Sequence, residues 1–394
     1  MRIQLWSYNY DPEPSGIAPL SGVWAREMKA RGHDVTVVAA HPHYPEPRWG
    51  TRLLPYREVR EGVPLLRLPL WIGRGSAIER MRQDGTFSAV LSAAMLTLPT
   101  PDVIIAVSPS FPALLPAMVN AKARRIPWML WLQDILPDGA AATGILEEGR
   151  VVELARKLER AAYRSAERIV VISESFKENL RAKQVPEDKL VLSYNPASKP
   201  ILTAPRDPAA IDPRLVLTMG NIGHSQNLAP VVRSFEDSDA VTELGARFVL
   251  AGDGDRGDEV RAAIRTDRVH VTGVLKAGPL EGHLDQAAVA VVSQGYEGID
   301  FNVPSKLMNF MAYGIPVVAS VRPDSEVARI IASSGCGWTT DSSDTGQLAA
   351  KLAGVLRRPD ELERRGAAGR AFAMEHFAPE PMARRFEAAL DAVV

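Results

Sequence analysis

Three loops in this sequence combine glycines with polar side chains, a composition that suits binding of an anion such as a phosphate group. They cover residues 10–18, 219–227 and 294–306. The third ends in Lys306, directly before an apolar helical segment. Free backbone N–H groups at the start of a helix attract an anion, and a neighbouring ammonium group adds a full positive charge. We therefore expect Lys306 to face a phosphate-bearing ligand; a solvated polar turn is the alternative interpretation of each loop taken alone.

A fourth loop, residues 252–257, matches the G-x-G-x-x-G pattern of dinucleotide-binding proteins. It does not open a domain, and the next expected strand, residues 269–272, does not end in the acidic residue that would hold a ribose. Asp253 and Asp255 could hold a metal ion, but carboxylates in a glycine-rich turn more often form solvated turns. We interpret this segment as a structural loop, and a dehydrogenase is the alternative function that it would support.

The elements that must position these loops follow from the hydrophobic pattern. Short apolar, β-branched runs alternate with segments of helical period, which is typical of an α/β fold with parallel sheets. Five prolines between positions 196 and 213 interrupt the alternation and indicate a linker between two doubly wound halves. Such halves bind ligands outside the carboxyl ends of their strands, so we expect the site in a cleft between them. The expected strands are residues 3–8, 35–39, 103–107, 128–132, 169–172, 190–193, 215–219, 248–251, 269–272, 288–292 and 316–319.

Composition excludes several classes of protein. The 46 Lys and Arg residues nearly balance the 47 Asp and Glu residues, so nothing favours a nucleic-acid partner held by bulk electrostatics. Cys336 is the single cysteine, which excludes an intrachain disulfide and a multi-cysteine zinc site. The apolar runs have the length of strands rather than the ~20 residues of a membrane span, and the first residues do not resemble a signal peptide. We expect a cytoplasmic protein whose membrane contact is at most peripheral, at the inner membrane face.

Several segments together resemble a known enzyme family. They are residues 8–19, 41–45, the Gln133-Asp134 pair, and residues 304–319, which include Pro-Ser-Lys-Leu and Ala-Tyr-Gly-Ile-Pro-Val-Val-Ala. On these motifs the chain resembles the retaining glycosyltransferases of family 4, which have the GT-B fold, and in particular the branch that builds colanic-acid and O-antigen polysaccharides. The resemblance implies two Rossmann-like domains that face a central cleft.

In that fold residues 1–198 would bind the acceptor and residues 199–375 the nucleotide sugar, while a helix over 376–394 packs back on the first domain. Carried over residue by residue, the resemblance places Gly16 near the diphosphate and acceptor, and Lys306 at the leaving diphosphate. Glu297 would hold hydroxyls of the donor sugar, with Asp300 as a competitor for that role. The other donor-side residues that it implies are Gly220, Asn221, Gly223, Gln226, Ser305 and Asn309.

The chain departs from the family pattern in three places. Asn309 stands where the family has a second glutamate that grips the ribose, and a neutral amide is the weaker acceptor. Asn221 and Gln226 replace the customary arginine and lysine, so Lys306 should matter more here than in a typical relative. Gln133 replaces a histidine that many relatives carry, beside Asp134.

The reaction that the resemblance implies is sugar transfer with retention, in which the departing phosphate assists attack on the same face. No divalent metal and no cofactor are expected. Asp134 is the candidate for orienting or deprotonating the acceptor, and a helix-capping aspartate is the alternative. His41, His43 and Gln133 are expected on the acceptor side.

The acceptor is the less defined substrate. Residues 70–82 mix aromatic, aliphatic and basic side chains, which suits contact with anionic lipid head groups. We therefore expect transfer from a UDP or GDP sugar to a lipid-linked saccharide in polysaccharide biosynthesis. The alternatives are transfer to a small-molecule natural product and a protein that binds nucleotide sugars without catalysis.

Overall fold

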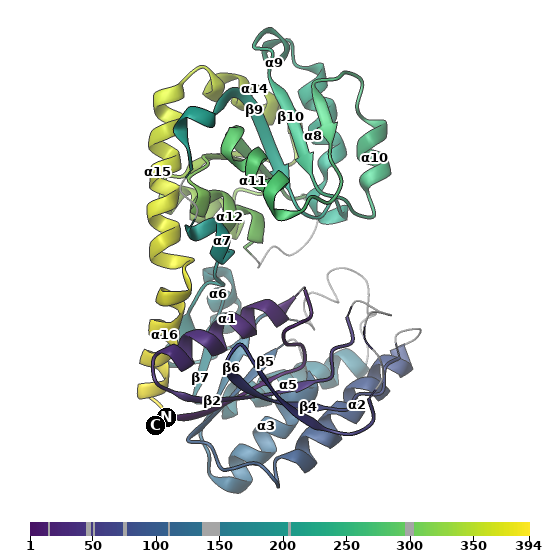
Figure 1. Cartoon of the computed structure of the whole chain (residues 1–394), viewed down its shortest axis with the longest axis vertical. Helices are drawn as coiled ribbons and strands as arrows, with labels where there is room; N and C mark the ends of the chain where they lie inside the picture. The colour runs from purple at the N-terminus through teal and green to yellow at the C-terminus, as the bar shows by residue number, and fades with distance from the viewer. Residues whose placement is uncertain are drawn as a thin grey trace. The chain divides into compact units, whose positions relative to one another are not determined.

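The computed structural model describes residues 1–14, 16–44, 49, 52–73, 77–108, 111–135, 150–203, 206–295 and 303–394. It divides the chain into two compact units, one formed by Met1–Asn195 together with Pro379–Val394, and the other by Pro196–Ala378. The two boundaries between the units lie at 195/196 and 378/379. The sequence predicts them at 198/199 and 375/376, three residues away in each case. Each unit is a layered α/β fold, as the alternation of apolar runs predicts (Figure 1).

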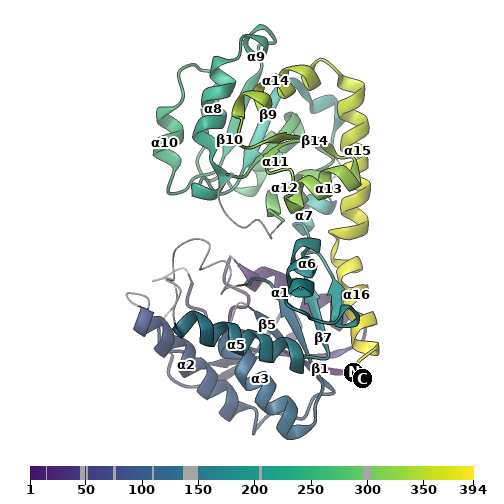
Figure 2. The same cartoon turned by 180° about the vertical axis from the view of Figure 1, so that it is seen from behind.

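The first unit has a sheet with strand order β3-β4-β2-β1-β5-β6-β7-β8, in which every pairing is parallel except that of β3 with β4. Alternate residues of the central strands point to a core under α1 and α16, which pack side by side (Figure 1). Helices α2, α3 and α5 lie on the opposite side of the sheet (Figure 2). The strands are β1 (Arg2–Ser7), β2 (Asp34–Ala40), β3 (Tyr56–Arg60), β4 (Val63–Leu68), β5 (Val103–Ser108), β6 (Trp128–Leu132), β7 (Arg168–Val171) and β8 (Leu190–Leu192). The helices are α1 (Ile17–Ala30), α2 (Ala77–Ala94), α3 (Phe111–Arg124), α5 (Arg150–Ser165), α6 (Glu174–Ala182) and α16 (Pro379–Asp391).

Helix α16 belongs to the first unit although it is the last helix of the chain. Its apolar stripe buries Met382, Phe386 and Leu390. The ring of Phe386 lies 5.5 Å from that of Trp24 and 5.1 Å from that of Trp131, measured between centroids. Burial of one such side chain stabilises the fold by roughly 1.5–3 kcal/mol. The helix is therefore part of the core of this unit.

The second unit has a fully parallel sheet with strand order β11-β10-β9-β12-β13-β14. Its strands are β9 (Asp212–Met219), β10 (Arg247–Ala251), β11 (Val269–Val271), β12 (Ala287–Ser293), β13 (Val317–Val321) and β14 (Gly337–Asp341). Its helices are α7 (Lys199–Thr203), α8 (Leu228–Asp237), α9 (Asp239–Glu243), α10 (Gly257–Ala262), α11 (Ala277–Gln286), α12 (Ser305–Tyr313), α13 (Glu326–Ser334), α14 (Thr345–Leu356) and α15 (Pro359–His376). Since every pairing is parallel, the loops that follow β9, β10 and β12 leave the same edge of the sheet.

Candidate functional site

In the second unit, the loops after β9 and β10 are joined backbone to backbone. The N–H of Gly220 donates to the carbonyl of Ala251 at 2.9 Å, and the N–H of Ile222 donates to that of Asp253 at 3.0 Å. A third bond runs the other way, from the N–H of Arg256 to the carbonyl of Ile222, also at 3.0 Å. The two loops therefore form one surface at the carboxyl edge of the sheet.

The glycines of the G-x-G-x-x-G segment are explained by this contact. A Cβ atom on Gly252 would lie 1.8 Å from the carbonyl oxygen of Gly220, and one on Gly254 would lie 2.6 Å from that of Ile222. Asp253 accepts the N–H of Gly254 at 2.9 Å and pairs with Arg261 at 3.2 Å, and these contacts lower its pKa. Among the described residues, no group of three His, Cys, Asp or Glu side chains could hold a metal ion. The segment acts as a packing element of the β9 loop.

Replacing Gly252 by alanine should therefore unfold or displace both loops. We expect the free energy of unfolding to fall by about 3 kcal/mol, because backbone rather than a flexible side chain blocks the methyl group. Urea denaturation measures the loss. Gly278, in α11, is the matched control, since its Cβ would meet no atom within 4 Å; its replacement by alanine should cost nothing. Equal stability of the two variants would contradict the tight approach.

Lys306 lies in the first turn of α12 and is brought to the β9 loop. A Cβ on Gly220 would be 3.8 Å from Cε of Lys306, and Gly220 has a φ of 94°, which favours glycine. The lysine is only 9% exposed, and no carboxylate or carbonyl of the described ranges pairs with its ammonium group. Burial lowers its pKa to about 8. A largely buried cation that no described residue pairs with is able to receive an anion.

The far end of α12 is fixed by two arginines. Arg206 donates to the carbonyls of Gly314, at 3.3 Å, and of Ala287. Arg370 donates to the carbonyl of Ala312. Cations at the carboxyl end of a helix satisfy its free carbonyls and complement its dipole. These contacts hold the helix and thereby place Lys306 at its other end.

At the start of α12, the backbone N–H groups of Ser305 and Lys306 make no hydrogen bond to the described residues. Pro304 is the capping residue and makes no side-chain cap, while Ser305 is exposed. Glu297 and Asp300, the acids expected at the donor sugar, lie in 296–302, outside the described residues. These N–H groups and the ammonium group of Lys306 belong to the same turn, a combination that suits an anion.

The polar residues of the β9 loop mostly shape the loop itself. Gln226 accepts the N–H of Gly223 at 2.9 Å through Oε1 and donates to Ser225 Oγ at 2.9 Å. Asn221 is exposed, and its side chain lies so close that a Cβ on Gly223 would be 2.5 Å from its Nδ2. Gly223 begins the turn and contributes its backbone. Of these expected phosphate ligands, Asn221 is the one with an exposed side chain.

Asn309, expected at the ribose, makes a contact that its position in the sequence does not suggest. Its Oδ1 accepts the N–H of Ser198 at 2.9 Å, at the start of the second unit. This bond uses one of the two lone pairs of Oδ1, so the second lone pair and the amide nitrogen are left for a ligand.

In the first unit, a buried carboxylate joins the loops after β1 and β2. Glu13 is 2% exposed; its Oε1 accepts the N–H groups of His43 and Tyr44 at 2.9 and 2.8 Å. Its Oε2 accepts Nδ2 of Asn9 at 2.9 Å. Gly16 follows in the same loop, exposed, with a φ of 64° at the start of α1. Glu13 was not singled out from the sequence, although an acid between two prolines in a loop expected to bind an anion was a signal.

The two histidines of the β2 loop are interior residues. His43 is 2% exposed; its Nδ1 lies 3.0 Å from the carbonyl oxygen of His41 and 3.3 Å from Glu13 Oε1, two acceptors, which assigns a proton to this nitrogen. Its Nε2 lies 3.4 Å from Nδ2 of Asn9, a donor. His41 is 5% exposed, and burial lowers its pKa. Both histidine side chains therefore lie in the interior of the loop and not on its surface.

A fully buried arginine was also missed. Arg67, on β4, donates to the carbonyls of Ala40, at 3.1 Å, and of Asp11, and to Oε1 of Glu58 at 3.0 Å. It ties the β1 loop to strands β2 and β3. In the sequence, the signal for this role is that Arg67 is the one charged residue in the otherwise apolar strand Val63–Leu68.

Two candidate site residues, Gln133 and Asp134, follow β6. Gln133 and Asn195 exchange two amide hydrogen bonds, at 2.9 and 2.8 Å. Asp134 is half-buried, and desolvation raises its pKa. Gln133 is thus bonded to Asn195, and Asp134 remains the candidate of this pair for a role at the substrate.

Residues 70–82, the expected acceptor segment, are only partly described. Trp71 is 44% exposed, and Leu70 is buried. In the described part of the chain, no helix is long and apolar enough to cross a bilayer.

Two family models match the chain. Residues 15–196 match the model described as "Glycosyl transferase 4-like domain". Residues 213–358 match the model described as "Glycosyl transferases group 1". The two matches fall one in each unit of the structure.

Two proteins with similar sequences are also described as glycosyltransferases. The colanic acid biosynthesis glycosyl transferase WcaI of Escherichia coli K12 is 24% identical over 354 residues, which cover 84% of this chain and 86% of that protein. The glycosyltransferase WbjE of Pseudomonas aeruginosa is 27% identical over 234 residues, 56% of this chain and 58% of that protein.

Solved structures share the fold. Alr3699/HepE of Anabaena, in complex with UDP, superposes over 100% of both chains with a TM-score of 0.71 at 13% identity. WaaG, a glycosyltransferase involved in lipopolysaccharide biosynthesis, superposes over 98% of both chains with a TM-score of 0.65 at 13% identity.

Proposed function

The chain belongs to the glycosyltransferases with the GT-B fold, and from that premise we propose that it moves a sugar from a nucleoside-diphosphate sugar to a saccharide acceptor in polysaccharide biosynthesis, with retention and without a metal ion. The observation that carries the donor side is Lys306. A largely buried ammonium group without a counter-ion in the described residues, beside Gly220 and at the start of α12, matches the charge of a diphosphate.

The proposed mechanism follows from where charge develops. As the glycosidic bond of the donor breaks, negative charge grows on the leaving phosphate and positive charge on the sugar. Lys306 and the first N–H groups of α12 stabilise the phosphate in fixed positions, which lowers the barrier without reorganisation. The phosphate oxygen that leaves the sugar then accepts the proton of the attacking acceptor hydroxyl. The new glycosidic bond therefore forms on the same face of the sugar from which the nucleotide departs.

The acceptor side is assigned to the first unit. Asp134 is the residue that we propose to orient the acceptor hydroxyl, because its half-buried carboxyl has a raised pKa and Gln133 beside it is committed to Asn195. The names of WcaI and WaaG support a saccharide acceptor of a surface polysaccharide. We propose a lipid-linked form of it, since exposed Trp71 provides an anchor at a membrane interface. A small-molecule acceptor is the alternative.

The proposal is tested by calorimetric titration of the chain with UDP and GDP, in buffer containing EDTA. We expect saturable binding of one of the two at a single site, unaffected by the chelator, and release of the corresponding nucleotide from its sugar when acceptor is present. Binding without any transfer or hydrolysis would favour the non-catalytic alternative. Failure of both nucleotides to bind would overturn the proposal, and a requirement for magnesium would overturn its metal-free form.

A further inference from the structure

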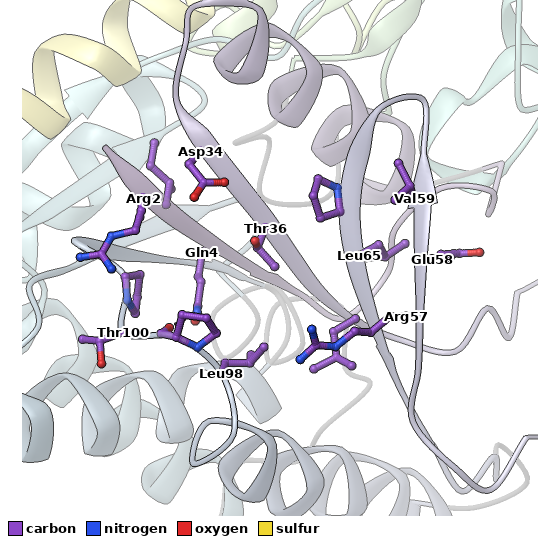
Figure 3. Close-up of a pocket in the computed structure, with 15 residues that line it drawn as sticks. Arg2, Gln4, Asp34, Thr36, Arg57, Glu58, Val59, Leu65, Leu98 and Thr100 are labelled. Carbon is purple, nitrogen blue, oxygen red and sulfur yellow. The ribbon is translucent and has the colours of Figure 1, made fainter.

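A cavity of about 500 Å³ lies in the first unit, toward the amino ends of β1 and β2. It is bounded by the first residues of β1 and β2, the β3–β4 hairpin and the segment before β5 (Figure 3). The loops proposed to act on the acceptor follow the other ends of β1 and β2. Gln4, the last residue of β1 in the lining, lies three residues before the end of the strand, a distance of about 10 Å. A ligand in the cavity would therefore be separate from the reacting groups.

The residues facing the cavity break the pattern of a parallel sheet. Inner parallel strands are covered on both faces and are normally apolar throughout. In β1 and β2, the face opposite the α1 core instead carries Gln4 and Thr36, and the cross-strand position on β3 carries Arg57 opposite Leu66. The sheet thus has a polar strip at this edge that neither its core nor the proposed reaction uses.

The polar side chains around the cavity divide into committed and uncommitted groups. Gln4 donates to the carbonyl of Pro99 at 2.9 Å and accepts Nε1 of Trp6 at 3.2 Å. Arg2 is paired with Asp102 at 3.0 Å, and the carboxylate of Glu58 is paired with Arg67. These groups form part of the cavity wall, and their polar atoms are bonded to other protein groups.

Three other polar side chains line the cavity, those of Asp34, Thr36 and Arg57. Within the described ranges, the side chains of Asp34, Thr36 and Arg57 make no hydrogen bond or ion pair to the protein. Figure 3 shows the guanidinium group of Arg57 extending across the cavity toward Leu98, with Thr36 and then Asp34 farther along. The wall between them is apolar and stiff: Leu66 and Leu98 are 8% and 7% exposed, and Pro64 and Pro99 adjoin them.

We propose that this cavity binds a small amphiphilic carboxylate that carries a hydroxyl or amino group at its other end. The carboxylate would pair with Arg57, whose planar guanidinium suits a two-oxygen partner. The apolar body would lie on Leu66 and Leu98, and the donor group would reach Asp34 and Thr36. A preformed apolar cavity of a few hundred Å³ with a few convergent polar groups is the usual form of a small-molecule site.

The probe is 4-hydroxyphenylacetate, measured by ligand-observed NMR titration of the full chain. We expect saturable binding with a dissociation constant of about 1 mM, as for a compound of this size. Two analogues test the ends of the site: 4-(2-hydroxyethyl)phenol lacks the carboxylate, and 4-methylphenylacetate lacks the hydroxyl. Both should bind about tenfold more weakly, the usual effect of losing a hydrogen bond to a charged group.

The variants assign the binding to this cavity. Arg57→Gln should weaken 4-hydroxyphenylacetate to the level of the analogue without a carboxylate, and Asp34→Asn should remove the preference for the hydroxyl. Arg364→Gln, an exposed arginine of α15, is the matched control and should bind as the unmodified chain does. Absence of saturable binding, or binding unchanged by Arg57→Gln in a variant with normal melting temperature, would overturn the proposal. None of these results depends on nucleotide binding.

Discussion

Replacing Lys306 by methionine should lower the rate of sugar transfer by about 10²–10³-fold, the usual effect of removing one preorganised group that stabilises a developing anion. Methionine keeps most of the volume of the side chain, so the fold should persist. The variant should even melt at a higher temperature at neutral pH, because burial has already lowered the pKa of this lysine to about 8 and a buried charge that no described residue pairs with is costly. A slower enzyme with a more stable fold is the result that separates this role from a structural one.

The same substitution should remove a pH dependence of nucleotide binding. In the unmodified chain, the ammonium form of Lys306 is present below pH 8 and is lost as the pH rises above it. Affinity for the diphosphate should therefore be constant below pH 8 and fall toward tenfold per unit above it. Lys276→Met, at an exposed lysine of the same unit, is the control and should change neither rate nor profile. An unchanged rate in the Lys306 variant would exclude a role at the leaving group.

Replacing Glu13 by glutamine should slow transfer by about 10²-fold, because the carboxylate holds together the loops after β1 and β2. The new amide would set a donor against Nδ2 of Asn9. If Asn9 turns over to accept it, its oxygen faces the lone pair of His43 Nε2, so the imidazole must change its protonation. We also expect the free energy of unfolding to fall by about 1–3 kcal/mol.

Nitrogen-15 NMR of the histidine rings reports that change directly. In the unmodified chain the ring of His43 should carry its proton on Nδ1, and the glutamine variant should shift this signal. Glu61→Gln is the control: Glu61 is exposed and pairs with Arg26, so the loss should stay below about 1 kcal/mol with full activity. Normal transfer by the Glu13 variant would show that the two loops need no such support.

The fold was accessible from the sequence wherever a strand is covered on both faces. Runs such as 103–107 and 288–292 have a single interpretation because every residue in them is apolar, and the structure places strands there. The β3–β4 hairpin was not expected. Its edge strand, Tyr56–Arg60, alternates half-buried and exposed residues but not apolar and polar ones, since Glu58 is half-buried and Val59 is exposed. Edge strands need little apolar surface.

The site was accessible only in part, because local spacing predicts what a loop can bind and not what it already holds. Lys306 could be singled out because a helix start and its charge are adjacent in sequence. Asn309 and Gln133 could not be assigned in the same way, since their partners, Ser198 and Asn195, are 111 and 62 residues away. An amide that finds a distant backbone or side-chain partner looks the same in sequence as one that is free for a substrate.

The return of the last helix to the first unit has a consequence for how the chain is made. A ribosome completes residues 1–195 long before it releases 379–394, and in that interval Trp24 and Trp131 lack the ring of Phe386 against which they pack. The core of the earlier half can therefore be completed only after the later half has been synthesised. Chaperone dependence during translation should accordingly concentrate on the amino-terminal half.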